Sequence, residues 1–273
     1  MKVASLPTLV FLIFTKNFII NNSDTNNFRI ISLVPSQTEL LIDLGLEKVI
    51  VGVTKFCVHP NHIKKTKTTV GGTKNCNFVK IKSLNPTHIL CNKEENTKEI
   101  VEECQKIAST HVSEIYTIKD SMKLIETYGI LFFKKTEASQ LIQKINYKLN
   151  SFNAFIKDKP ALKVAYFIWR NPWMVAGNNT YINHILELNK FDNVYKNKER
   201  YPEIKIEKMM SERKPDLLLL SSEPYPFKEE HGLQLNKTIN ETKTFFVDGE
   251  LFSWHGSRLL KAFDYFILLR NSL

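Results

Sequence analysis

The sequence predicts an α/β fold of two lobes, each built on a parallel sheet, with a single long helix joining them. Three observations carry this prediction. Short apolar strands alternate with amphipathic helices, the alternation recurs in a second half, and a long helical pattern separates the halves. Alternating strands and helices are typical of parallel sheets covered on both faces. A chain of 273 residues also exceeds the usual size of one core, so about two domains are expected.

The first strand and helix lie in residues 29–46, RIISLVPSQTELLIDLGL. The apolar run before Pro35 is typical of a buried strand, and the leucines after it recur at helical spacing. Ser36 and Glu39 form an S-x-x-E pattern, which predicts a capping box, and Gly45 marks the expected end of the helix. A helix start at the carboxyl end of a strand is a frequent ligand position, although an ordinary strand-to-helix turn has the same pattern.

The second half repeats the plan of the first. The strand in residues 29–34 is followed, after a helix and a Gly-rich loop, by a short helix, a proline and an apolar strand in residues 79–90. The strand in residues 163–168 is followed in the same way by residues 206–220. This internal repeat predicts two related, Rossmann-like lobes.

A long helix is expected between the halves. Apolar residues recur at three- and four-residue steps from Ala138 to Ile156, and Pro160 ends the pattern. Such a helix would restrain the lobes far more than a Gly/Ser linker, whereas packing within one domain is the alternative. The predicted organisation is an N-terminal segment, an N-terminal lobe, a linking helix and a C-terminal lobe, at residues 1–28, 29–134, 135–158 and 159–273.

The N-terminal segment has two interpretations. Lys2 and the apolar run at residues 3–14 resemble a secretory signal, but no small-x-small cleavage site precedes Arg29 and no cysteine is available there for lipidation. The run is also short for a membrane span. We expect a periplasmic or cell-envelope location if the run is a signal, and a cytoplasmic one if it is a mis-extended start.

Charge and cysteine spacing narrow the function classes. The net charge is +10, yet the lysines are scattered and no RNA-binding or helix-turn-helix pattern accompanies them, so no nucleic-acid partner is expected. Attraction to an anionic partner or membrane surface is the alternative. The four cysteines lack C-x-x-C spacing, which argues against zinc. Cys91 and Cys104 fall on apolar patterns as core thiols, whereas Cys57 and Cys76 lie on expected loops, where a disulfide is left open.

Aromatic and basic side chains gather on the loops expected after strands. They are Phe56 and His59 in the first half, and Trp169, Arg170, Trp173, Tyr201, Tyr225, Trp254 and His255 in the second. All three tryptophans belong to this set. A broad, partly apolar ligand would fit aromatic faces with a few polar groups. The alternative is that Trp169 and Trp254 are core anchors at strand ends.

Together these segments resemble the substrate-binding proteins of ABC importers for cobalamin and iron chelates, the type with a helical backbone between two lobes. The resemblance covers residues 29–266 and is carried by RIISLVPSQTELLIDLGL, VGVTKFCVHP, VGGTKN, VAYFIWRNPWMVAG, LLLLSSEPYPFKEEH and VDGELFSWHGSRLL. It implies a monomer that is not an enzyme, needs no cofactor, holds a corrinoid or ferric chelate between its lobes and delivers it to an ABC permease. Haem or a bare metal ion are the alternative ligands.

A metal could be bound directly or within the ligand. His59 or His255 could coordinate a metal centre, although a lone loop histidine is more often solvated or hydrogen-bonded. Asp248, Glu250 and His255 could form an oxygen and nitrogen site, but no second histidine at helical spacing supports it. The metal ligands are therefore left unassigned.

The resemblance also implies docking on the permease through one surface glutamate in each lobe. Glu207 has this position in the second lobe, whereas Val79 stands at the first-lobe position. Glu39 or another carboxylate would have to substitute for the missing glutamate.

An enzyme is the competing class. Cys57 with His59, or Ser257 in the WHGSR segment, could be imagined as nucleophile and base. Ser257 lacks the G-x-S-x-G pattern, and Cys57 has no third orienting residue by spacing. The sequence also has no G-x-G-x-x-G and no P-loop. These features favour binding over catalysis.

Overall fold

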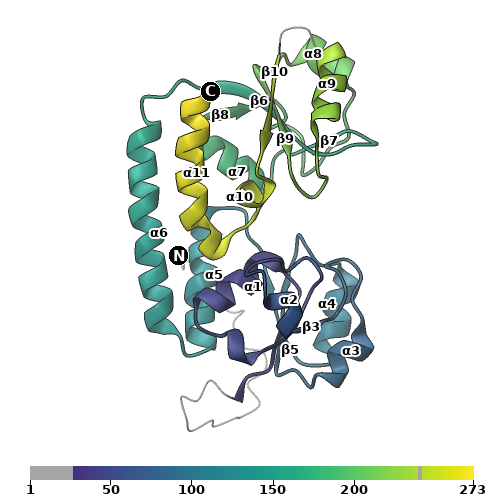
Figure 1. The fold of residues 1–273 in the computed structure, drawn as a ribbon, viewed down its shortest axis with the longest axis vertical. Coiled ribbons are helices and arrows are strands. Elements are labelled where there is room, and N and C mark those ends of the chain that lie inside the picture. The colour runs from purple at the N-terminus through teal and green to yellow at the C-terminus, as the bar shows by residue number, and fades with distance from the viewer. Residues whose placement is uncertain (1–26, 239–241) are drawn as a thin grey trace, which may run out of the picture.

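The computed structural model describes residues 27–238 and 242–273. The apolar run after Lys2 lies outside this part of the chain. Two lobes, each with its own sheet, are stacked along the long axis of the molecule, and a long helix runs beside both (Figure 1). We call the lobe with strands β1 to β5 the first lobe and the lobe with β6 to β10 the second.

The first lobe contains a five-stranded sheet in the order β3-β2-β1-β4-β5. All of its strand pairs are parallel. The strands are β1 Ile30–Ser32, β2 Ile50–Val53, β3 Thr68–Thr69, β4 His88–Asn92 and β5 Ser109–Ser113. The helices are α1 Pro35–Asp43, the 3₁₀ turn η2 Glu47–Val49, α2 Ile63–Thr66, α3 Phe78–Ser83, α4 Lys98–Gln105 and α5 Ile118–Leu131.

The second lobe contains a sheet in the order β10-β9-β6-β7, with β8 also paired to β6. The strands are β6 Leu162–Trp169, β7 Met174–Val175, β8 Phe191–Asn193, β9 Leu217–Ser221 and β10 Lys243–Val247. The helices are α7 Tyr181–Leu188, α8 Ile206–Glu212, α9 Glu229–Thr238, α10 Gly249–Ser253, η3 Gly256–Arg258 and α11 Leu259–Ser272. The pairs are parallel except for β7, which pairs antiparallel with β6 through a short turn.

The long helix α6, Lys135–Ile156, agrees closely with the helix expected from the sequence. It does not stand alone, because α11 lies beside it (Figure 1). Phe152 of α6 packs on Phe263 and Phe266 of α11, with ring centres 5.9 and 6.0 Å apart. Two packed helices therefore form the spine of the molecule. Within the described ranges, no helix combines the length and apolar character that a membrane span requires.

The capping box expected at Ser36 and Glu39 is wrong. Val34 is the N-cap of α1, and no side chain caps the helix. The Ser36 hydroxyl instead lies 3.4 Å from Nε2 of His255, and Glu39 accepts a hydrogen bond from Arg258. Polar partners from distant parts of the chain have thus replaced the local cap. The predicted helix end is confirmed, since α1 stops at Asp43 and Gly45 has a φ of +75°.

The four cysteines are free thiols. Cys91 and Cys104 are fully buried, as expected of core residues. Cys57 is also buried, with its sulfur 3.1 Å from the hydroxyl of Thr38. Cys76 donates to the carbonyl of Gly72. Cys57 and Cys76 therefore do not form the disulfide that the sequence left open.

Candidate functional site

The two lobes meet at side chains that follow the carboxyl ends of strands. In the first lobe, His59 lies on the loop after β2 and Glu94 on the loop after β4. In the second lobe, Glu223 follows β9 and Glu250 follows β10. Parallel sheets bind ligands at this end of their strands. We call the region that contains these residues, with Arg200, Trp254 and Arg258, the interlobe junction.

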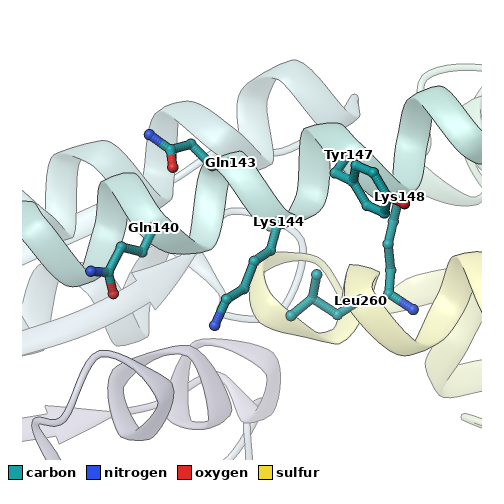
Figure 2. Close-up of a pocket in the computed structure, with 6 residues that line it drawn as sticks. All are labelled: Gln140, Gln143, Lys144, Tyr147, Lys148 and Leu260. Atoms are coloured by element: carbon teal, nitrogen blue, oxygen red, sulfur yellow. The ribbon is translucent and has the colours of Figure 1, made fainter.

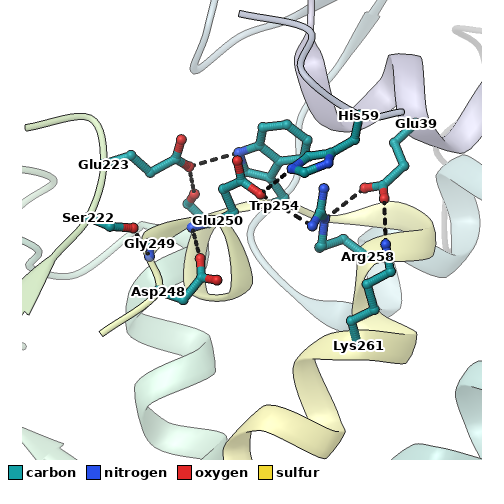
Figure 3. Close-up of polar contacts among 11 residues, drawn as sticks. Glu39, His59, Ser222, Glu223, Asp248, Gly249, Glu250, Trp254, Arg258 and Lys261 are labelled. Atoms are coloured by element: carbon teal, nitrogen blue, oxygen red, sulfur yellow. Dashed lines mark hydrogen bonds and ion pairs between the residues drawn. The ribbon is translucent and has the colours of Figure 1, made fainter. Parts of the chain in front are cut away.

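His59 connects the lobes at this junction (Figure 3). Its Nε2 lies 2.7 Å from Oε2 of Glu250, and its ring meets the Trp254 ring edge-on at 5.5 Å. The fold therefore brings together two of the predicted site residues, His59 and Trp254, from opposite lobes. Trp254 is only 7% exposed, so most of its side chain packs against protein, as the core-anchor interpretation expects.

Arg258 is a buried cation that ties η3 to the first lobe. Its Nε donates to Oε2 of Glu39 at 2.8 Å, and Nη1 lies 3.2 Å from Oε2 of Glu250. Its guanidinium group also lies 4.8 Å from the centre of the Trp254 ring. Because Arg258 is only 5% exposed, its positive charge is stabilised by these carboxylates rather than by water. Lys261 adds a weaker, more exposed contact to Glu39.

Glu223 is held in a fixed orientation by two donors. Its Oε1 accepts from Nε1 of Trp254 at 2.7 Å and from the Ser253 hydroxyl at 2.8 Å (Figure 3). Burial, and next the charge of Glu250, raise the pKa of Glu223 to about 7. Gly249 permits this packing, since a Cβ there would lie 2.7 Å from Cγ of Glu223.

A second ion pair crosses between the lobes. Nη2 of Arg200 lies 2.8 and 2.9 Å from the two carboxylate oxygens of Glu94. The guanidinium group of Arg200 is also 5.9 Å from the ring centre of Tyr201. The predicted residue Tyr201 therefore lies beside a contact between the lobes.

Four other predicted residues form one cluster in the second lobe. Trp169 meets Tyr225 edge-on at 5.5 Å, and Arg170 lies 5.8 Å from the Trp173 ring. Phe227 connects these pairs, because Trp173 stacks on it at 6.0 Å and Tyr225 contacts it at 4.8 Å. Trp169 is 40% exposed. Trp169 is the most exposed ring of this cluster, since Trp173 and Tyr225 are half-buried and Phe227 is buried.

Phe56 and His255 lie apart from that cluster. Phe56 is 48% exposed, and the ammonium group of Lys55 lies 5.0 Å from its ring centre. His255 is buried between Ser36 and Tyr181, with a ring distance of 6.2 Å to the latter. Burial lowers the pKa of His255 to about 4, so this imidazole is neutral at physiological pH.

The sequence reasoning missed several charged residues of the junction. Glu94, Arg200 and Glu223 were not singled out, and Arg258 was quoted only within a motif. The available signal was the carboxyl end of a strand, since Glu94 and Glu223 each follow an apolar run within two residues of its end. Their partners come from distant loops, and spacing alone does not reveal them.

Within the described ranges, the junction holds no metal-binding cluster, and a hollow on the spine lies apart from it. Across the described ranges, no group of three or more His, Cys, Asp or Glu side chains is arranged to hold a metal ion. A hollow of about 430 Å³ lies instead on the spine (Figure 2). It is lined by Gln140, Gln143, Lys144, Tyr147 and Lys148 of α6 and by Leu260 of α11.

Two α/β lobes on a helical spine, which meet at the carboxyl ends of their strands, define the class of two-lobed solute-binding proteins. The chain belongs to the periplasmic binding protein family, whose sequence pattern it matches over residues 30–249. A curated relative from Bacillus subtilis strain 168, the uncharacterized ABC transporter substrate-binding lipoprotein YvrC, is 23% identical over 249 residues. The match covers 86% of this chain and 77% of YvrC.

Solved structures agree with this fold. The periplasmic heme-binding protein RhuT from Roseiflexus sp. RS-1 superposes with a TM-score of 0.77 at 16% identity, over 90% of this chain and 98% of RhuT. The vitamin B12 binding protein BtuF of Vibrio cholerae gives 0.71 at 17% identity, over 90% and 98%. A possible iron-binding protein from Staphylococcus epidermidis ATCC 12228 gives 0.73 at 22% identity, over 89% and 97%.

Proposed function

We propose that this chain is the solute-binding component of an ABC importer and binds a cobalamin-like corrinoid or an iron chelate between its lobes. The observation that carries the proposal is the convergence of side chains from both lobes at one junction. His59 meets Glu250 and Trp254 there, and Glu94 meets Arg200. A ligand held at this junction would contact both lobes at once.

The side chains favour a broad ligand with both apolar and polar edges. Trp169 and Phe56 are large and partly exposed, so they can cover flat apolar surface. The carboxyl and guanidinium groups of the junction can meet amides, carboxylates or bound metal. The binding proteins of similar fold are named for heme and for vitamin B12, which are ligands of this kind. Haem is accordingly the second candidate.

Cys57 and Ser257, the two candidate nucleophiles, lie in environments that do not favour nucleophilic attack. Burial raises the pKa of the Cys57 thiol, which disfavours the reactive thiolate. Ser257 is 5% exposed, and its hydroxyl has no partner among the described residues that could act as its base.

We further propose an extracytoplasmic location and a permease as partner. Both follow the Bacillus subtilis relative, whose name describes a substrate-binding lipoprotein of an ABC transporter. In the implied docking mode, Glu207 on α8 would contact the permease. Val79, which is 81% exposed on α3, would face the permease from the first lobe without a charge.

An absorption spectrum tests the ligand class. Protein purified from its native source, or mixed with cyanocobalamin, haemin or a ferric chelate and desalted, should retain a visible band when a corrin, haem or iron chelate is bound. Native mass spectrometry of the same sample would give the ligand mass. A colourless protein that binds none of these compounds would contradict the proposal.

A further inference from the structure

Glu223 differs from the other acidic side chains of the junction because its partners are neutral donors, whereas Glu39, Glu94 and Glu250 each pair with a basic side chain. Oε1 accepts hydrogen bonds from Trp254 and Ser253. No hydrogen bond or ion pair reaches Oε2 from any residue in the ranges 27–238 and 242–273. In Figure 3 this oxygen points away from the Trp254 ring. The carboxyl group is therefore fixed by the protein on one side and open on the other.

The neighbouring charges leave Glu223 without a cation of its own. Glu250, on α10, is already paired with His59 and Arg258. Arg258 lies over the Trp254 ring and is bound to Glu39 as well. After burial, two carboxylates raise the pKa of Glu223: Glu250, and Glu95 from the loop after β4 in the first lobe. A negative charge on Glu223 is thus opposed from both lobes.

We propose that Glu223 is a specificity-determining residue, which selects ligands that bring a positive charge or a strong hydrogen-bond donor to its open oxygen. This inference rests on the proposed function, since it requires that a ligand binds at the junction. A cation beside Oε2 would offset the repulsion from Glu250 and Glu95. An anionic group in the same place would add to it, so ligands edged with carboxylates are disfavoured there.

The orientation of the carboxyl group supports this role. Two short bonds to a buried indole and to a helix hydroxyl fix the direction of Oε2 before the ligand arrives, so little side-chain entropy is lost on binding. A charge-assisted hydrogen bond to such an acceptor is stronger than a neutral one. The raised pKa agrees with this arrangement, because burial and two nearby carboxylates let the carboxyl group hold its proton until a cation replaces it.

Matched pairs of ligands test the inference. Ferrioxamine B carries a protonated amine that its N-acetyl derivative lacks, and aquacobalamin carries a positive charge that cyanocobalamin lacks. For whichever pair binds, the wild-type protein should prefer the cationic member. Glu223→Gln should weaken the cationic member roughly tenfold or more and the neutral member by less than about threefold. The amide oxygen of glutamine can still accept from Trp254, so folding should be preserved.

The controls separate the possible outcomes. Glu212→Gln, at an exposed carboxylate of α8 in the same lobe, should leave both affinities unchanged. Equal loss of both members in Glu223→Gln, or no wild-type preference for the cation, would overturn the role of Glu223 while leaving ligand binding intact. Failure of every probe to bind the wild-type protein would overturn the proposed ligand class together with this inference. The wild-type preference also remains measurable should the variant fail to fold.

Discussion

Glu223, half-buried after β9, and His255, buried after α10, lie on different loops of the second lobe, and their pKa values are shifted in opposite directions. Burial and Glu250 raise the pKa of Glu223 from an ordinary value of 4.5 to about 7, with Glu95 as a further charge. Burial lowers the pKa of His255 from 6.5 to about 4. Between about pH 5 and 6.5, folding therefore binds a proton at Glu223 and releases one at His255, and the two effects nearly cancel.

Glu223→Gln should reveal the contribution of His255 to the pH dependence of stability. The raised pKa of Glu223 favours the folded state below pH 4.5, and this advantage is lost as the pH rises through about 7. Without Glu223, the free energy of unfolding should rise more steeply between pH 5 and 6.5, by about 1.4 kcal/mol per pH unit relative to wild type. Denaturant titrations at several pH values measure both slopes. Parallel slopes would contradict the assigned shift.

Trp169 should contribute to binding more than to folding. Because this side chain is 40% exposed, Trp169→Ala should weaken ligand binding by about 1 to 3 kcal/mol with little change in melting temperature. Trp173 is the matched control, since its ring stacks on Phe227 and should stabilise the lobe. Fluorescence titration and thermal melts of both variants distinguish the roles. A destabilised Trp169→Ala protein with unchanged affinity would make Trp169 a core residue.

Between elements, a buried ion pair of Arg258 with Glu39 links η3 to α1. Arg258→Met would leave Glu39 buried with only the exposed Lys261 beside it, so the variant should lose about 3 to 5 kcal/mol of stability. Lys261→Met should cost less than about 1 kcal/mol, because its side chain is 66% exposed. Chemical denaturation measures both. Similar small losses would mean that water reaches the Arg258 site.

The elements were easier to predict from the sequence than the contacts between them. Apolar periodicity predicted β1, α1 and α6, because burial of one face leaves a repeating pattern in the chain. The cap at Ser36 was misread, since His255 and Arg258 are more than two hundred residues away and no local pattern reports them. The same reason explains why Glu223 was missed: its donor Trp254 lies on a different loop.

The helices α3 and α8 have equivalent places in the two lobes but different surfaces. Val79 and Glu207 are each the second residue of the helix, and both are exposed. If Glu207 docks the permease, Glu207→Lys should reduce uptake in cells without changing ligand affinity. Val79→Glu should leave uptake unchanged or improve it. Normal uptake in Glu207→Lys, with tight ligand binding retained, would indicate a ligand store or sensor rather than a transport component.

At the scale of the whole molecule, the lobes are connected by the spine, by the contacts of His59 and Arg258 at the junction, and by a more exposed ion pair. The packed pair α6 and α11 forms the spine, while the ion pair of Glu94 with Arg200 joins the loops after β4 and β8. Helices resist bending more than extended strands do, and an exposed ion pair contributes at most about 1 kcal/mol. The spine should therefore control how far the lobes separate, and the ion pair only how often they do.

Small-angle scattering with and without a bound ligand tests this division. The radius of gyration should change little on ligand addition, because α6 and α11 keep the lobes at a fixed spacing. Arg200→Gln should leave that radius unchanged and raise the ligand dissociation rate by a few fold, since only the weak link between the loops is lost. A large decrease in radius on binding would show that the spine bends, and the lobes would then close on the ligand as hinged domains.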